Sequence, residues 1–185
     1  MPLDTIRAIR TRYSCRAFTD QIPSREDLNT IAEAAAAAPS GGNRQLWRVI
    51  VVKQKQLLGE LESEGMKILA ALPDKSLYER IQSRGGKLYY NAPCQIVIPI
   101  IKDGSAIDCG IVAENIALAA ASLGIDSLIC GLASFSYAGE KGAAFKKQLG
   151  FPEGYELGIA VLLGYAEKPG GEPHEPDLNK ILWIE

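Results

Sequence analysis

The chain has 185 residues, 47% hydrophobic and 23% charged, which is ordinary for one globular domain spanning residues 1–185. Its formal net charge of −2 gives no support for a nucleic-acid-binding surface, and its single histidine, His174, argues against a histidine-based metal site. Four cysteines without CxxC spacing, and residues 1–16 without a hydrophobic signal segment, lead us to expect a cytoplasmic protein with reduced thiols and no metal.

The N-terminal part predicts a short helix and then an extended segment. Residues 3–10 carry apolar side chains at helical spacing, and residues 11–20 follow as the extended segment. Alternate residues of an extended chain face the same side, so Arg12, Ser14 and Arg16 are expected to line one face. Two guanidinium groups beside a hydroxyl suit an anion such as phosphate, and a solvated basic edge is the alternative.

A helix, a loop of small residues and a strand follow one another next. The helix begins at Ser24, an N-cap with Asp27 in a capping-box position, and Pro39 stops it. The loop 40–45 then offers free backbone amides and three consecutive polar side chains before the β-branched strand 49–52. Such a loop suits a flat polar ligand; the alternative is an ordinary connection between helix and strand.

The rest of the chain alternates helices with strands. Apolar spacing predicts helices at 54–72, 75–83, 106–123 and 140–149, and strands at 94–101, 127–130 and 156–165. Gly65 is expected to weaken the middle of the first of these helices. Ser105 caps the helix 106–123 and Gly124 ends it, and its apolar residues, from Ile107 onward, run nearly all round, so burial on several sides is expected.

The whole pattern is that of an α+β fold with central strands wrapped by helices. Residues 131–136 are expected to form a loop, and the tail 166–185 ends in an apolar stretch, 181–184, which needs a surface such as a partner subunit to cover it. Gly85-Gly86-Lys87 lacks the other glycine and the Ser or Thr of a phosphate-binding P-loop, and no GxGxxG motif of a Rossmann site occurs.

Four segments, in this order and spacing, make the chain resemble the FMN-dependent nitroreductase family over nearly its whole length. They are RYSCR at 12–16, APSGGNRQLW at 38–47, AENIALAAASLGIDSLICGL at 113–132 and GIAVLLGYA at 158–166. The first fits the family pattern R-x-S-x-R/K. The second fits A-P-S-x-x-N-x-Q-P-W except that Leu46 replaces the second proline. Each motif is weak alone, and the four together are specific.

The resemblance implies an α+β fold with a central, mainly antiparallel sheet flanked by helices, assembled as an intertwined homodimer with FMN at the subunit interface. It implies an enzyme that passes electrons from NADH or NADPH to nitroaromatics, quinones or related electron-poor small molecules by a ping-pong mechanism. Two alternatives stay open: a flavin-destroying or dehalogenating enzyme of the same fold, and a flavin-binding module without turnover. The stretch 60–90 is the expected substrate lid, and no nucleic-acid or membrane partner is expected.

The same resemblance assigns residues to the two ends of the flavin. Arg12 and Ser14, with Tyr13 between them, are expected at the phosphate, and Arg16 beside the ribityl chain and the pyrimidine. His174 takes the place of the basic tail residue that the family usually sets against the phosphate. The residues expected to approach the same FMN from the other subunit are Pro39, Ser40, Gly41 and Asn43.

The flavin ring is expected beside the end of the third strand. The residues implied there are Ile129, Cys130, Gly131 and Leu132. A backbone N–H of Gly131 or Leu132 would lie near N5, and Lys87 would reach the pyrimidine edge. Arg16 and Gly131 are the expected catalytic residues, because a fixed cation favours the negative charge of the reduced flavin and a backbone amide needs no particular side chain.

Three neighbouring side chains are expected to be structural. Trp47 is expected to belong to the core rather than to stack on substrate. Cys130 is expected to be a buried, inert thiol. The same role is expected for Cys15, although its place between two arginines offers the alternative of a lowered pKa.

Overall fold

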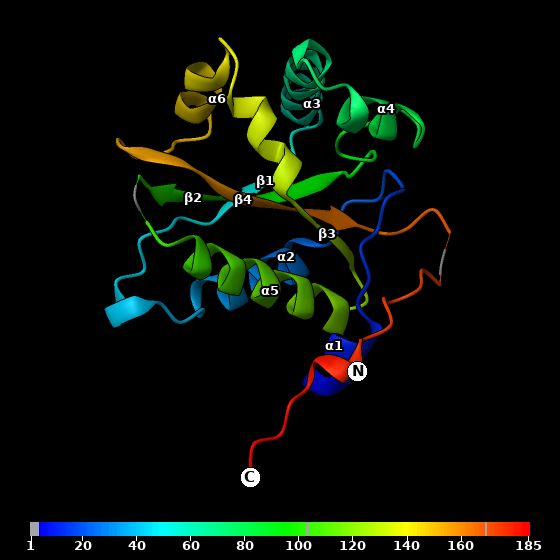
Figure 1. Cartoon of the computed structure of the whole chain (residues 1–185). Helices are drawn as coiled ribbons and strands as arrows, with labels where there is room; N and C mark the ends of the chain where they lie inside the picture. The colour runs from blue at the N-terminus through cyan, green and yellow to red at the C-terminus, as the bar shows by residue number, and fades with distance from the viewer. Residues whose placement is uncertain (1–3, 103, 169) are drawn as a thin grey trace.

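The computed structural model describes residues 4–102, 104–168 and 170–185. Within these residues the centre of the fold is a four-stranded antiparallel sheet in the order β1-β2-β4-β3 (Figure 1). The strands are β1 (Ile50–Val52), β2 (Cys94–Ile101), β3 (Asp126–Cys130) and β4 (Tyr155–Gly164). The predicted central antiparallel sheet is therefore confirmed, with strand ends within about two residues of those expected.

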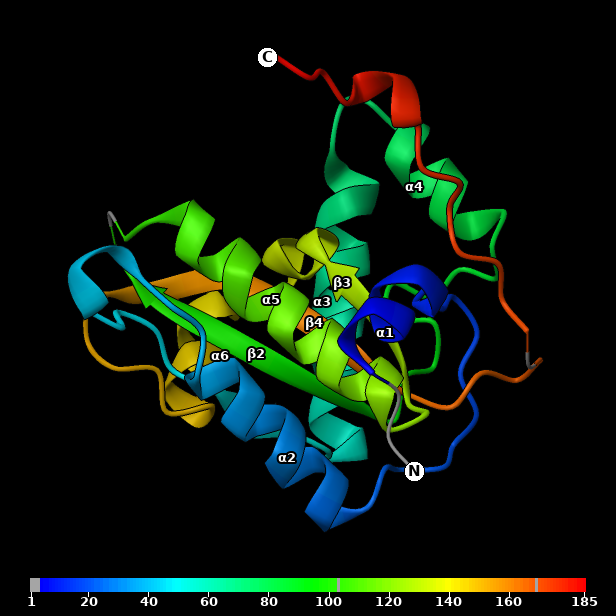
Figure 2. The same ribbon diagram turned by 90° about the horizontal axis from the view of Figure 1, so that it is seen from below.

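Helices cover both faces of the sheet. They are α1 (Thr5–Thr11), α2 (Arg25–Ala36), α3 (Lys55–Ala71), α4 (Ser76–Gln82), α5 (Ala106–Ser122) and α6 (Gly142–Gln148), with the 3₁₀ segments η1 (Gly41–Asn43), η2 (Gly131–Tyr137) and η3 (Leu178–Lys180). In Figure 1, α3, α4 and α6 lie above the sheet and α1, α2 and α5 below it. Figure 2 shows α5 and α2 running side by side across the lower face. The start predicted for the first helix, residue 3, lies outside the described residues.

The prediction of a loop at 131–136 was wrong, because these residues form η2. Its inner side chains, Ala133, Ser136 and Tyr137, are buried, so the segment is held by tertiary packing rather than by an apolar repeat of its own. Ser134 also donates from its hydroxyl to the carbonyl of Gly131, at 2.9 Å. A turn stabilised in this way has no periodic pattern in the sequence.

Two apolar clusters fill the spaces on either side of the sheet. β2 is covered on both faces, so its residues alternate between them: Cys94, Ile96 and Ile98 pack with α2 and α5, and Val97 packs with α3 and η2. Pro99, which has no N–H to give to the ladder, coincides with a register shift against β4. Trp47 is buried in the cluster under α2 and α5, as expected.

The helix ends agree with the sequence in two places and differ in two. Ser24 accepts a hydrogen bond from the N–H of Asp27, at 3.0 Å, and Gly124 takes the left-handed conformation that ends α5, with φ +75°. Ser105 makes no side-chain capping bond with any described residue. Ile107 is 75% exposed rather than buried, although the next two residues of the same turn, Asp108 and Cys109, are buried. Among the described residues, no helix has the length and hydropathy required to cross a bilayer.

Gly65, expected to weaken α3, is instead required by its packing. A Cβ at this position would lie 2.6 Å from Cδ2 of Leu88 and 2.7 Å from Oγ of Ser136. Helix α3 therefore approaches η2 more closely than any larger residue would allow. The same contact brings η2 and the segment before β2 together under one helix.

We expect Gly65→Ala to lower the free energy of unfolding by about 1–3 kcal/mol, because the new methyl overpacks the contact with Leu88 and Ser136. The matched control is Gly59→Ala on the same helix, where a Cβ would meet no described atom within 4 Å. That control should raise the stability by about 0.5–1 kcal/mol through helix propensity alone. Urea unfolding of both variants measures the difference, and equal stability changes would contradict the packing argument.

Candidate functional site

The RYSCR segment lies along the free edge of β3. Ser14 forms a parallel bridge with Ser127, and the N–H of Cys15 donates to the carbonyl of Ser127 at 2.9 Å. The motif therefore lies at the beginning of β3, whereas residues 129–132 lie at its end and in the first turn of η2. One strand thus carries the expected phosphate residues near one end and the expected ring residues at the other.

The residues after this motif tie it to two further segments. The N–H of Phe18 donates to the carbonyl of Tyr90 at 3.1 Å, and the N–H of Thr19 donates to the carbonyl of Tyr165 at 2.8 Å. Phe18 itself is buried in the core and anchors the crossing. These bonds bring the chain around Arg16 close to the stretch that contains Lys87, two positions expected to share the pyrimidine side of a flavin.

Arg12 is oriented by an acid that the sequence interpretation did not assign. Its Nε lies 3.3 Å from Oε1 of Glu114 on α5. Arg16 donates from Nη1 to the carbonyl of Ser14 at 3.2 Å, so both guanidinium groups are held near the motif. Because the described bond of Arg12 uses Nε–H, the four Nη hydrogens can serve an anion. In the sequence, the only local sign of a role for Glu114 was that it is an acidic residue on a mostly apolar helix.

The tail crosses the motif at Tyr13. A Cβ at Gly171 would lie 2.0 Å from Cε2 of Tyr13, so the tail backbone rests directly on this ring. Asp126 accepts a bond from the N–H of Ala166 at 2.8 Å and fixes the start of the tail. Burial and the Asp126 carboxylate raise the pKa of Tyr13, which keeps its phenol neutral. His174 is exposed, three residues beyond the contact with Tyr13.

The loop that follows α2 lies far from the motif in the same chain. η1 and α1 are at opposite sides of the molecule in both Figure 1 and Figure 2, with the 17-residue helix α5, roughly 25 Å long, between them. The N–H of Ile101 donates to the carbonyl of Leu46, which holds the loop at the end of β2. A single chain therefore does not bring Pro39–Asn43 to residues 12–16.

The loop has a fixed internal geometry. Ser40 accepts a bond from the N–H of Gln45 at 2.9 Å, and Asn43 accepts a bond from the side chain of Gln45 at 2.7 Å. Gly42, Asn43 and Gln45 all have positive φ angles, and for the two that are not glycine this conformation carries strain. A Cβ at Gly41 would meet no described atom within 4 Å, so this part of the loop is open to a neighbour.

The end of β3 offers an open position next to an apolar side chain. Ile129 is 37% exposed, and a Cβ at Gly131 would meet no described atom within 4 Å. Cys130 points inward, and burial raises its pKa to about 11. Burial likewise raises the pKa of Cys15, so both thiols are protonated at neutral pH, in agreement with the structural role expected for them.

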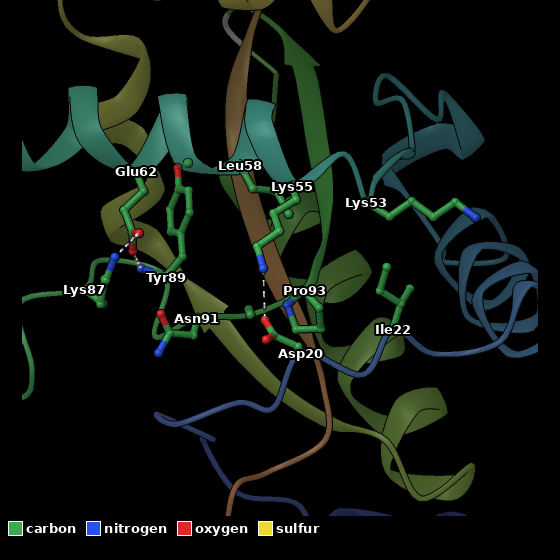
Figure 3. A pocket seen from close by; sticks show the side chains of 12 residues that line it. Asp20, Ile22, Lys53, Lys55, Leu58, Glu62, Lys87, Tyr89, Asn91 and Pro93 are labelled. Atoms are coloured by element: carbon green, nitrogen blue, oxygen red, sulfur yellow. Dashed lines mark hydrogen bonds and ion pairs between the residues drawn. The ribbon is translucent and has the colours of Figure 1, made fainter.

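Lys87 lines a cavity of about 350 Å³ beside α3, which residues 12–14 and 129–132 do not line (Figure 3). Its ammonium is 3.7 Å from Oε2 of Glu62, whose other oxygen accepts the N–H of Tyr89 at 2.7 Å. The cavity is lined by Asp20, Ile22, Lys53, Lys55, Leu58, Gly59, Glu62, Lys87, Tyr89, Asn91, Ala92 and Pro93. Glu62 was not singled out in the sequence, although it lies on the apolar face of α3, four residues after Leu58.

A sequence model of the Nitroreductase family matches residues 9–165. The chain belongs to the nitroreductase family. Among solved structures, it is similar to a nitroreductase with bound FMN from Desulfitobacterium hafniense DCB-2, at 51% identity over 100% of both chains and a TM-score of 0.95. A nitroreductase with bound FMN from Bacteroides fragilis NCTC 9343 is 30% identical, over 99% of this chain and 100% of that chain, with a TM-score of 0.89.

A curated relative from Archaeoglobus fulgidus has the provisional name NADH dehydrogenase/NAD(P)H nitroreductase. It is 33% identical over 164 residues, which cover 88% of this chain and 85% of that protein. These likenesses confirm the family and the fold expected for this nitroreductase-family chain. The roles assigned to individual residues stay predictions.

Proposed function

We propose that the chain is an oxidoreductase with FMN as its cofactor, which takes electrons from NADH or NADPH and reduces nitroaromatic, quinone or related electron-poor acceptors by a ping-pong mechanism. The observation that carries the proposal is the FMN-bound nitroreductase that matches the whole chain at 51% identity. Together with the archaeal NAD(P)H nitroreductase relative, it supports the enzyme class and the cofactor. The acceptors and the order of the two half-reactions are the finer part of the proposal.

The residues present fit FMN. Arg12 keeps its Nη donors free of Glu114 near the beginning of β3, where an anionic phosphate would lie. At the other end of the strand, the exposed side chain of Ile129 adjoins the open position at Gly131, where a flat ring can approach the backbone. A ligand with an anionic end and a flat, largely apolar end matches this arrangement.

FMN, when bound, supplies the electron-transfer chemistry, and the chain supplies orientation and charge. Arg12 and Ser14 bind the phosphate, and Arg16 and Lys87 place positive charge at the pyrimidine, where reduction adds negative charge. Gly131 presents backbone to N5 without a side chain in the way. The stretch 60–90 is proposed to border the acceptor; its buried residues Leu61, Leu69 and Leu88 anchor it to the core.

The shared site requires two copies of the chain. The loop Pro39–Asn43 and the motif 12–16 lie at opposite ends of α5, so the loop of one copy serves the motif of the other in the proposed homodimer. The tail supports the same assembly, because Trp183 and Ile184 are 84% and 90% exposed. His174 is proposed to approach the phosphate, and the cytoplasmic location stays a prediction from the sequence.

The purified protein should be yellow, and anaerobic addition of NADH or NADPH should bleach the flavin absorbance. A nitroaromatic or quinone added afterwards should restore the colour, with parallel lines in double-reciprocal plots of steady-state rates. A colourless protein that takes up no added FMN would refute the cofactor assignment. Flavin that stays oxidised in the presence of both nucleotides would instead favour a binding module without turnover.

A further inference from the structure

Glu62 lines the cavity beside α3. Figure 3 shows its carboxylate reaching both Lys87 and the backbone of Tyr89. The Glu62 side chain is only 15% exposed, whereas that of Lys87 is 53% exposed. The acid is therefore the fixed member of the pair, and the lysine is the member that can swing toward a ligand.

The surroundings of Glu62 explain why it is fixed. Its hydrogen bond from Tyr89 is 2.7 Å long, and the ring of Tyr89 is buried with its hydroxyl 2.6 Å from Oγ of Ser136 in η2. The next residues, Tyr90 and Asn91, have left-handed backbone angles, φ 51° and 61°, so the segment makes a sharp turn beside the acid. Glu62 thus links α3 to the segment that carries Lys87.

The charge of Glu62 also extends to the flavin side of the fold. The pKa of Cys130, next to Gly131, is raised first by burial and to a smaller extent by the Glu62 carboxylate. Burial is likewise the largest cause of the raised pKa of Tyr89, and the Glu62 carboxylate is a minor one. Cys130 adjoins Gly131, at the end of β3 where the flavin ring is proposed to lie.

We propose that Glu62 is a positioning residue that lowers the reduction potential of the bound flavin, by holding the Lys87 ammonium in an ion pair beside the pyrimidine edge. The proposal rests on the proposed function. The dihydronicotinamide gives a hydride, its C–H bond breaks and the hydride bonds to flavin N5, so the nicotinamide is oxidised and the flavin gains one negative charge. Lys87 stabilises that charge, and Glu62 offsets part of the stabilisation.

The consequence for catalysis is a balance between the two half-reactions. A lysine without its acid would hold the reduced flavin more tightly and make it a weaker reductant for the acceptor. In the ion pair, Lys87 still stabilises the reduced flavin, but less strongly than an unpaired lysine would. Hydride uptake by the flavin and electron transfer to the acceptor therefore both stay favourable. This role needs no contact between Glu62 and the acceptor.

The test is the flavin midpoint potential of the holoenzyme, measured anaerobically against a reference dye. Glu62→Gln keeps an oxygen for the Tyr89 N–H while it removes the charge. We expect its preference for reduced over oxidised FMN to rise about tenfold, which corresponds to about +30 mV for a two-electron couple. Lys87→Met should shift the potential in the opposite direction, and the double variant should match Lys87→Met alone, because Glu62 acts through the lysine.

Glu60→Gln is the matched control, since Glu60 lies two residues away on the exposed side of α3, bonded to Gln56. It should leave the potential unchanged. A shift for Glu62→Gln no larger than that of this control, or one that persists in the Lys87→Met background, would overturn the proposal. If Glu62→Gln does not fold, an unchanged potential for Lys87→Met overturns it alone. Loss of FMN binding in the wild type would instead refute the proposed function.

Discussion

Arg12→Ala should weaken FMN binding by roughly 10- to 100-fold, measured as the fluorescence change when FMN is titrated into the apoprotein. The variant removes a charged, forked donor from the proposed phosphate position, and a hydrogen bond to a charged group contributes about 1.5–3 kcal/mol. The fold should survive, because the Glu114 side chain left behind is 43% exposed and can be rehydrated.

Two control variants separate phosphate binding from other effects of removing charge. Arg25→Ala removes an equally charged, exposed residue at the first position of α2 and should leave FMN affinity within about twofold. Glu114→Gln loses the ion pair of Arg12 but keeps the guanidinium, so it should weaken FMN much less than Arg12→Ala. Equal affinity for Arg12→Ala and Arg25→Ala would remove the phosphate assignment.

Deletion of residues 178–185 should convert the protein from a dimer to a monomer in size-exclusion chromatography with light scattering. The deleted segment holds apolar side chains that are exposed in the single chain, namely Leu178, Ile181, Leu182, Trp183 and Ile184. Covering each large apolar side chain contributes about 1.5–3 kcal/mol, so their loss should raise the dimer dissociation constant by at least about 100-fold. FMN should be lost with the dimer.

The tail also offers a polar control. Lys180→Gln combined with Glu185→Gln changes only charged, exposed positions of the same segment and should leave the dimer intact. A truncated protein that stays dimeric would show that the apolar tail is not the segment that joins the copies. A wild-type monomer loaded with FMN would show that one chain forms the whole site.

The elements that were predicted correctly are those whose pattern is local. β2 is a continuous apolar run and α2 has a capping serine, so each can be recognised from neighbouring residues alone. η2 could not be predicted in this way, because the burial of its inner residues depends on packing against α3, which is remote in sequence. The packing role of Gly65 was missed for the same reason: its neighbours, Leu88 and Ser136, are remote in sequence.

The residues of the candidate site also fall into those with a local sequence pattern and those that depend on contacts made by the fold. The residues of the RYSCR and APSGGN motifs could be named from the sequence, because their spacing within each motif matches a family pattern. Glu114 and Glu62 could not, since each matters through a partner, Arg12 or Lys87, that only the fold brings near. The role of an acidic residue on an amphipathic helix cannot be assigned until its neighbours in the fold are known.

The separation of η1 from the RYSCR segment by the length of α5 has a genetic consequence under the proposed dimer. In that dimer, each site combines the RYSCR motif of one chain with the loop of the other. A substitution of Arg12 therefore damages the site that contains the chain's own motif, whereas a substitution of Asn43 damages the site that contains the partner's motif. When two such damaged chains pair, both lesions fall on one site and the other site is whole. Defects at the two ends of α5 are therefore complementary between alleles, whereas two defects at the same end are not.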